Sequence, residues 1–180
     1  MRLGTSVLLL LLLCTSAFPQ KAAPRKVPEF AFTQVSGGQT PLSQYAGKAV
    51  LLEVVSTTCQ YCGPALQALN RLQEEFGRRG LQAVAVAVNP NASVLVNDFA
   101  KEQHLTFPFG WCTREQARKL LALTPSDRFV VPQVVLINPT GEIIQQTAPQ
   151  GEDPLRNEST LRARLSALLT PVARTEGRTK

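Results

Sequence analysis

Residues 49–64, AVLLEVVSTTCQYCGP, decide the fold and the chemistry. Residues 49–55 are apolar apart from one acid, Glu53, and three of them are β-branched valines, a composition typical of a strand buried on both faces. Two cysteines, Cys59 and Cys62, follow this strand directly. Two thiols at that spacing can close a small ring as a disulfide and open it again. The stretch therefore predicts a dithiol–disulfide redox centre where a strand meets a helix.

The rest of the chain alternates between strand and helix patterns. Apolar residues at helical spacing predict helices over 64–76, 94–103, 113–123 and 159–169, and Thr113 and Gln116 form a capping box. Apolar and β-branched runs predict strands over 30–35, 49–55, 81–88, 130–137 and 142–146, with a helical turn at 42–45, an extended segment at 105–109, a hairpin turn at 138–141 and a loop at 153–157. This order predicts an α/β fold in which helices flank a mixed central sheet.

Composition indicates one globular domain that does not bind nucleic acid. The chain has 180 residues, of which 44% are hydrophobic and 18% charged, enough for a sizeable core. The net charge of +6 is spread over solvated helix faces, without the dense basic and aromatic block of a nucleic-acid site. We expect a targeting segment at 1–20, a linker at 21–28, a folded domain at 29–170 and a flexible tail at 171–180. We also expect a monomer.

The first twenty residues have the order of a secretory signal. Arg2 is followed by an apolar run at 7–13 and by small residues at 15–17. The run is short for a membrane span. Cleavage after Ala17, lipidation at Cys14 and an uncleaved anchor all remain open. Each places the domain in the periplasm or on the outer face of the cytoplasmic membrane, where disulfides persist.

Several motifs together resemble one family. The strand–CxxC–helix unit, Pro132 at the start of a later strand, the Asn138–Gly141 hairpin and the lead-in at 28–48 are similar to the exported thioredoxin-like proteins of bacteria, the TlpA/ResA group of the redoxin (AhpC-TSA) superfamily. The resemblance covers residues 27–169. It implies a thioredoxin-like fold with an N-terminal β-hairpin-type extension and a βα insertion.

The resemblance also implies an activity and its partners. Such proteins are thiol–disulfide oxidoreductases that act on client proteins with cysteines, such as cytochrome c apoproteins, and that take electrons from a membrane donor of the thiol-reductase type. No cofactor or metal is implied. We expect the exchange to be reductive, keeping the cysteines of the client reduced. The identity of the client and the redox potential stay open, because Thr58 replaces the family's tryptophan, Ala65 replaces a glutamate and Val131 replaces a threonine.

Roles for the catalytic residues follow from the resemblance. Cys59, at the start of a helix that favours its thiolate, is the attacking thiol, and Cys62 resolves the mixed disulfide to give the Cys59–Cys62 redox-active disulfide. Glu53 stands where thioredoxins place a buried acid. Burial would raise its pKa, so that it can take a proton from Cys62 and return it.

The substrate-binding residues are expected around this pair. The Val131–Pro132 bond is expected to be cis, which brings the backbone of Val131 beside Cys59, where an extended substrate can pair with it. Gln60 and Tyr61, between the two cysteines, complete the predicted contact surface.

Other interpretations of these residues stay open. Ser56 three residues before Cys59 resembles part of a peroxiredoxin site, which would make the protein a peroxidase. The CxxC pair could also serve a metal-binding module, although only Cys112 and His104 could add ligands, at an unusual spacing. Cys112 is either a second thiol near the site or, as buried cysteines commonly are, an apolar core residue. We expect His104 to be structural.

Overall fold

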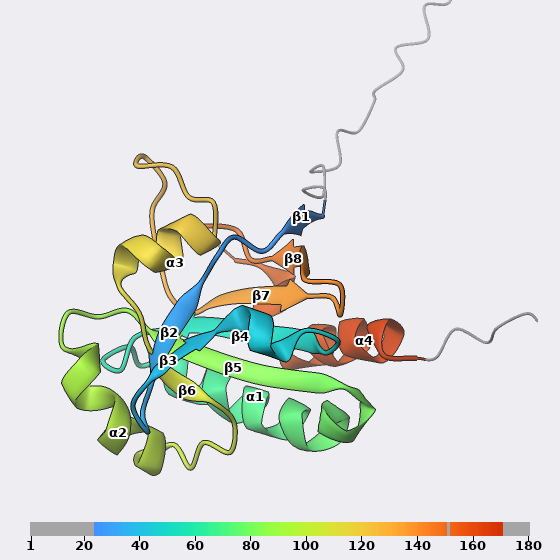
Figure 1. Ribbon diagram of the computed structural model, residues 1–180, viewed down its shortest axis with the longest axis horizontal. Helices are drawn as coiled ribbons and strands as arrows, with labels where there is room; N and C mark the ends of the chain where they lie inside the picture. The colour runs from blue at the N-terminus through green and yellow to red at the C-terminus, as the bar shows by residue number, and fades with distance from the viewer. Residues whose placement is uncertain (1–23, 151, 171–180) are drawn as a thin grey trace, which may run out of the picture.

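A mixed sheet of eight strands organises the computed structural model, which describes residues 24–150 and 152–170 (Figure 1). The strands lie in the order β1-β8-β7-β4-β5-β6-β2-β3. Strands β4, β5 and β6 are parallel, and every other neighbouring pair is antiparallel. Their bounds are β1 Arg25–Lys26, β2 Ala31–Gln34, β3 Gln39–Pro41, β4 Ala49–Val55, β5 Leu81–Ala87, β6 Phe109–Trp111, β7 Gln133–Ile137 and β8 Glu142–Gln146. The predicted fold class is confirmed, and β4 lies at the centre of the sheet.

Helices cover both faces of this sheet (Figure 1). Side chains of α1, α2 and α4 enter the hydrophobic cluster on one face, and those of α3 enter the cluster on the other. The bounds are α1 Cys62–Phe76, α2 Ala92–Glu102, α3 Arg114–Leu120 and α4 Glu158–Leu168, with 3-10 turns η1 Leu42–Tyr45, η2 Gly77–Arg79 and η3 Pro154–Arg156. The predicted capping box is present, because the Thr113 side chain accepts from Gln116 N–H and the Gln116 side chain accepts from Thr113 N–H.

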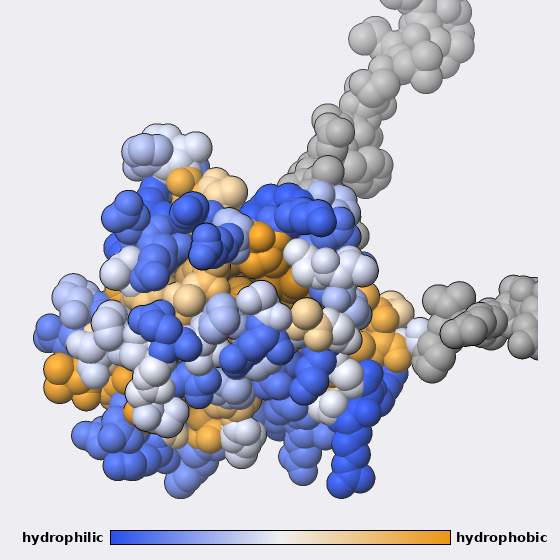
Figure 2. Space-filling model, viewed as in Figure 1, coloured by the Kyte–Doolittle hydropathy of each residue, from blue (hydrophilic) through white to orange (hydrophobic). Residues whose placement is uncertain are grey.

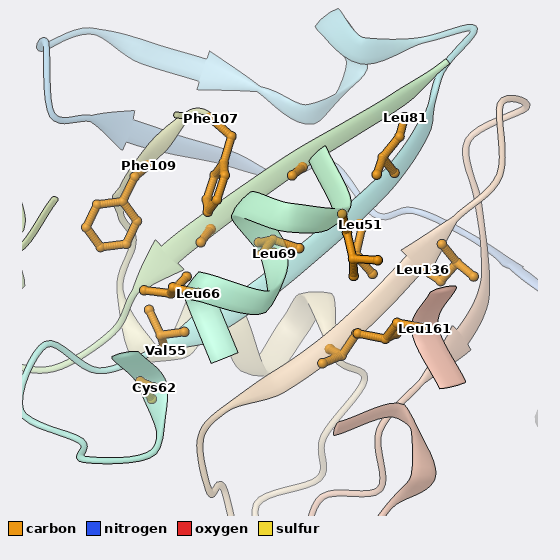
Figure 3. Packing of buried hydrophobic residues seen from close by; sticks show 14 of the residues in the cluster. Leu51, Val55, Cys62, Leu66, Leu69, Leu81, Phe107, Phe109, Leu136 and Leu161 are labelled. Carbon is orange, nitrogen blue, oxygen red and sulfur yellow. The ribbon is translucent and has the colours of Figure 1, made fainter. Parts of the chain in front are cut away.

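The core is split by the sheet into two clusters. Side chains alternate along β4, so Leu51 and Val55 point to the α1 face while Leu52 and Val54 point to the α3 face. Besides Cys62, helix α1 adds four fully buried side chains to the first cluster, at the spacing of one helical stripe: Leu66, Leu69, Leu72 and Phe76. Each such burial contributes about 2 kcal/mol. Figure 3 shows Cys62 at the same end of this cluster as Val55.

Several boundaries differ from those predicted. The segment expected to be a linker contains β1, which pairs with β8, and the predicted loop at 153–157 contains η3. Strand β3 was not predicted, β6 lies at the end of the expected extended segment and beyond it, and β7 begins at Gln133 rather than at 130. Helix α1 begins two residues earlier than predicted, at Cys62. The missed strands have two or three residues, too few to show an alternating pattern.

The predicted leader at 1–20 and tail at 171–180 lie outside the described residues. Within 24–150 and 152–170, no helix has the length and hydropathy needed to cross a bilayer. Figure 2 shows mainly hydrophilic side chains on the face it presents, with hydrophobic ones near its middle and in smaller groups at its left and right edges.

Candidate active site

The two cysteines lie where β4 ends and α1 begins. The chain turns after Val55, and Cys59 N–H donates to the Ser56 carbonyl at 3.2 Å. Cys62 N–H in turn donates to the Cys59 carbonyl at 3.1 Å, at the first residue of the helix. Both are free thiols. Cys59 is half-buried and Cys62 is fully buried, so one sulfur is open to a partner and the other is shielded.

Each sulfur has a backbone contact. The Cys59 thiol donates to the Val131 carbonyl, with 3.8 Å between sulfur and oxygen. Ser56 N–H donates to the Cys62 sulfur at 3.5 Å. The Val131–Pro132 peptide bond is cis, as the resemblance implied. The more accessible sulfur therefore lies beside the backbone that precedes the cis proline.

Burial keeps the inner thiol protonated. Removal from water raises the pKa of Cys62 well above its ordinary value, and the neighbouring Cys59 and the Glu53 charge raise it further, while the hydrogen bond from Ser56 N–H acts in the opposite direction. A thiol must lose its proton before its sulfur can attack. Cys62 therefore needs a base close by.

Glu53 is a carboxyl buried on the cysteine side of the sheet. It is 2% exposed and lies between Ala85 on β5 and Val134 on β7 in the strand register. Alternation along β4 puts it on the same face as Leu51 and Val55. Its Oε2 atom has no hydrogen-bond partner among the described atoms, and burial raises the pKa of Glu53 to about 8. The predicted burial and the raised pKa are both confirmed.

Gln60 and Tyr61 face outward between the cysteines. Both are exposed, Tyr61 to 68% of its surface. Val131 and Pro132 are half-buried. An exposed aromatic ring two residues after the more accessible thiol, Cys59, can contact a docked partner at little cost in desolvation.

An anchor for the cysteine loop was missed from sequence. Thr57 N–H donates to Asn89 Oδ1 at 3.0 Å, and Asn89 Nδ2 donates to Thr57 Oγ1 at 2.9 Å. Parallel pairing of Val55 with Ala87 brings the ends of β4 and β5 together, which explains the contact. Asn89 lies between the strand predicted over 81–88 and the helix predicted over 94–103, and no role was predicted for it. Its position two residues after a parallel strand was the available signal.

The cis-proline segment has a buried anchor of its own. Gln133 is 1% exposed, and its Nε2 donates to the Val130 carbonyl at 2.9 Å and to the Ala148 carbonyl at 3.2 Å. Thr147 Oγ1 donates to Gln133 Oε1 at 2.8 Å and accepts from Val134 N–H at 3.0 Å. The available sequence signal for this network was Gln133, a polar residue inside a predicted apolar strand, but no role was predicted for it.

The third cysteine lies apart from the pair. Cys112 belongs to the cluster on the α3 face, and burial raises its pKa to about 12. This favours the packing role over a second thiol at the site. His104 is exposed just after α2, with a positive φ of 46°. In the described part of the chain, no group of three or more His, Cys, Asp or Glu side chains is placed to hold a metal ion.

The AhpC/TSA family model matches residues 24–146, more than half of the chain. The chain belongs to the AhpC/TSA family. Among curated relatives, it is 29% identical over 150 residues to the thiol-disulfide oxidoreductase ResA of Geobacillus kaustophilus, covering 78% of this chain and 83% of ResA. It is also 26% identical over 137 residues to ResA of Bacillus thuringiensis subsp. konkukian, covering 73% of this chain and 76% of that protein.

Solved structures agree with this fold. A putative thiol:disulfide interchange protein DsbE from Chlorobium tepidum superposes with a TM-score of 0.68 at 22% identity, covering 82% of this chain and 98% of that one. A thiol:disulfide interchange protein from a Bacteroides species gives 0.67 at 14% identity, covering 87% and 95%. This AhpC/TSA protein therefore has the thioredoxin-like fold.

Proposed function

We propose that this protein is a thiol–disulfide oxidoreductase that reduces disulfides of client proteins by exchange at Cys59 and Cys62. One observation carries the proposal. A half-buried sulfur lies 3.8 Å from the carbonyl before a cis proline, with a buried second thiol at the start of the same helix. The relatives named thiol-disulfide oxidoreductase ResA support the same class of activity.

Exchange proceeds in two thiol–disulfide steps, and in each step one disulfide bond forms as another breaks. The Cys59 thiolate attacks one sulfur of a client disulfide, which forms a mixed disulfide and releases one client thiolate. The Cys62 thiolate then attacks the Cys59 sulfur, which forms the Cys59–Cys62 disulfide and releases the second client thiolate. The client gains two electrons, and the protein's dithiol loses them.

Glu53 serves the second step as a base. Cys62 is protonated because it is buried, and a carboxylate on the same face can accept its proton. A pKa of about 8 for Glu53 is close to neutral pH, so the carboxyl can both take up and release a proton there. When the disulfide is reduced again, Glu53 returns a proton to Cys62.

Client recognition uses the backbone beside the cis proline. An extended client segment adds to the site as a short strand along Val131 and Pro132, which aligns its disulfide with Cys59. The exposed side chains of Gln60 and Tyr61 contact the residues that flank the client cysteine. No charge lies between the two cysteines to select a client.

The cycle needs an outside source of electrons. We propose export through the leader, a membrane donor of the thiol-reductase type and cytochrome c apoproteins or similar clients. N-terminal sequencing of the protein from fractionated cells tests export. The reduction potential of the pair tests direction, since a value near about −270 mV supports a reductase and one near about −120 mV an oxidant.

A trapping experiment tests the exchange itself. Cys62→Ser should accumulate a mixed disulfide through Cys59 when mixed with oxidised insulin, because the resolving thiol is missing. Cys59→Ser should neither form that adduct nor reduce insulin. Insulin reduction that survives Cys59→Ser would refute the proposal. Peroxide consumption with sulfenic acid at Cys59 would instead support the peroxidase alternative, and stoichiometric bound metal the metal-binding one.

A further inference from the structure

Each carbonyl of the cis-proline segment has a different partner. Gln133 Nε2 donates to the carbonyl of Val130, and the Cys59 thiol donates to that of Val131. The Pro132 carbonyl accepts from Arg156 Nε at 3.2 Å. The side chain of Arg156 thus holds Pro132, the residue that follows Val131, whose carbonyl contacts the attacking thiol.

Arg156 reaches this carbonyl from η3, which is itself fixed. Asp153 Oδ1 accepts from Leu155 N–H at 2.9 Å, and Asp153 Oδ2 accepts from Ala148 N–H at 2.7 Å. The Leu155 side chain is buried beneath the turn. Arg156 Nη2 also donates to the Ala148 carbonyl at 3.3 Å. The guanidinium therefore bridges the residue before β7 and the residues that follow β8.

We propose that Arg156 is a positioning residue that holds the cis-proline backbone in the orientation a client segment needs. The inference rests on the proposed function, in which an extended client pairs with Val131. A planar guanidinium presents its donors in fixed directions, so two carbonyls bound to one Arg156 are held in a fixed relative position. Without these bonds the Pro132 peptide can rotate, and the edge offered to the client is no longer fixed.

The role acts on client binding and not on the sulfurs. Arg156 donates to the backbone carbonyls of Pro132 and Ala148, whereas the electrostatic influences on Cys62 come from Cys59 and Glu53. A small disulfide needs no strand pairing to reach Cys59. A protein disulfide does need strand pairing. Rates with a protein disulfide therefore report on backbone positioning and thiol reactivity together, whereas rates with a small disulfide report on thiol reactivity alone.

The test compares both classes in matched variants. Arg156→Gln should lower kcat/KM for insulin reduction by about tenfold, mainly through KM, because it removes the guanidinium that bonds the Pro132 and Ala148 carbonyls. The rate with 5,5′-dithiobis(2-nitrobenzoate) should stay within about twofold of the wild type. Arg156→Lys keeps the cation but not the planar fork, and should be intermediate. Arg164→Gln, an exposed arginine on α4, is the control and should match the wild type with both substrates.

Other outcomes overturn the inference. Equal losses with insulin and the small disulfide would mean general damage to the fold, which a fall in the thermal midpoint of Arg156→Gln would accompany. Unchanged insulin kinetics in a folded Arg156→Gln protein would show that the bridge is not needed. A wild-type protein that reduces neither substrate would refute the proposed function itself, and the role of Arg156 would fall with it.

Discussion

Replacing Glu53 with glutamine should abolish a pH dependence of stability that the buried carboxyl imposes on the wild type. The folded protein holds Glu53 with a pKa of about 8, while the unfolded chain holds it near the ordinary 4.5. Because the folded pKa is the higher, the stabilising contribution is complete below pH 4.5. It is then lost as the pH rises, since the unfolded chain releases its proton first.

The magnitude follows from the gap between the two pKa values. They differ by about 3.5 pH units, and each unit is worth ~1.4 kcal/mol, so the free energy of unfolding falls by about 5 kcal/mol between pH 4.5 and 8. Between pH 5 and 8, the other groups with shifted pKa values change the stability little. The hydrogen bond from Arg71 lowers the pKa of Glu158 to about 2, so its effect is complete by pH 5, and the raised pKa of Cys62 acts at higher pH.

Urea unfolding of the reduced protein at half-unit steps from pH 5 to 8 measures this slope. Wild type should lose about 1.4 kcal/mol per unit, while Glu53→Gln should stay level and become the more stable protein near pH 8. Glu74→Gln, which removes an exposed carboxyl from α1, is the control and should keep the wild-type slope. Parallel curves for wild type and Glu53→Gln would refute the burial argument.

Three further substitutions test the scaffold. Asn89→Ala removes both bonds to Thr57 and should cost about 1–3 kcal/mol in urea unfolding, because the loop N–H loses its acceptor. Gly110→Ala should cost about 2 kcal/mol or more and speed hydrogen exchange in β2, since a Cβ there would overlap the Thr33 carbonyl. Thr113→Ala should cost about 1 kcal/mol through the lost cap of α3, measured by thermal unfolding.

The central elements were predictable because each carries a periodic signal. The run at 49–55 matches β4 at both ends, and the helix predicted over 64–76 matches α1 apart from its first two residues. Short edge strands such as β1 and β3 are defined by pairing with distant segments, so no local pattern reveals them. The start of β7 was placed too early because residues 130–132 are apolar but belong to the cis-proline loop.

The candidate site divides in the same way. Cys59, Cys62 and Glu53 could be predicted from sequence, because their residue types stand out beside an apolar strand. The side chains that hold the loops in place, Asn89 and Arg156, lie 27 or more residues away in sequence from the cysteines and are polar residues in turns. Only the folding of β5 beside β4, and of η3 beside the cis proline, gives them a partner.

The two buried cysteines show that burial alone does not make a thiol part of the site. Burial raises the pKa of both Cys62 and Cys112, yet the two belong to clusters on opposite faces of the sheet. Glu53 lies on the Cys62 face of the sheet because side chains alternate along β4. A shift of the β4 register by one residue would put Leu52 or Val54 in its place. In the proposed mechanism, the position of one acid within a seven-residue strand decides which buried thiol has a base, because Glu53 lies on the Cys62 face of the sheet and Cys112 packs on the other.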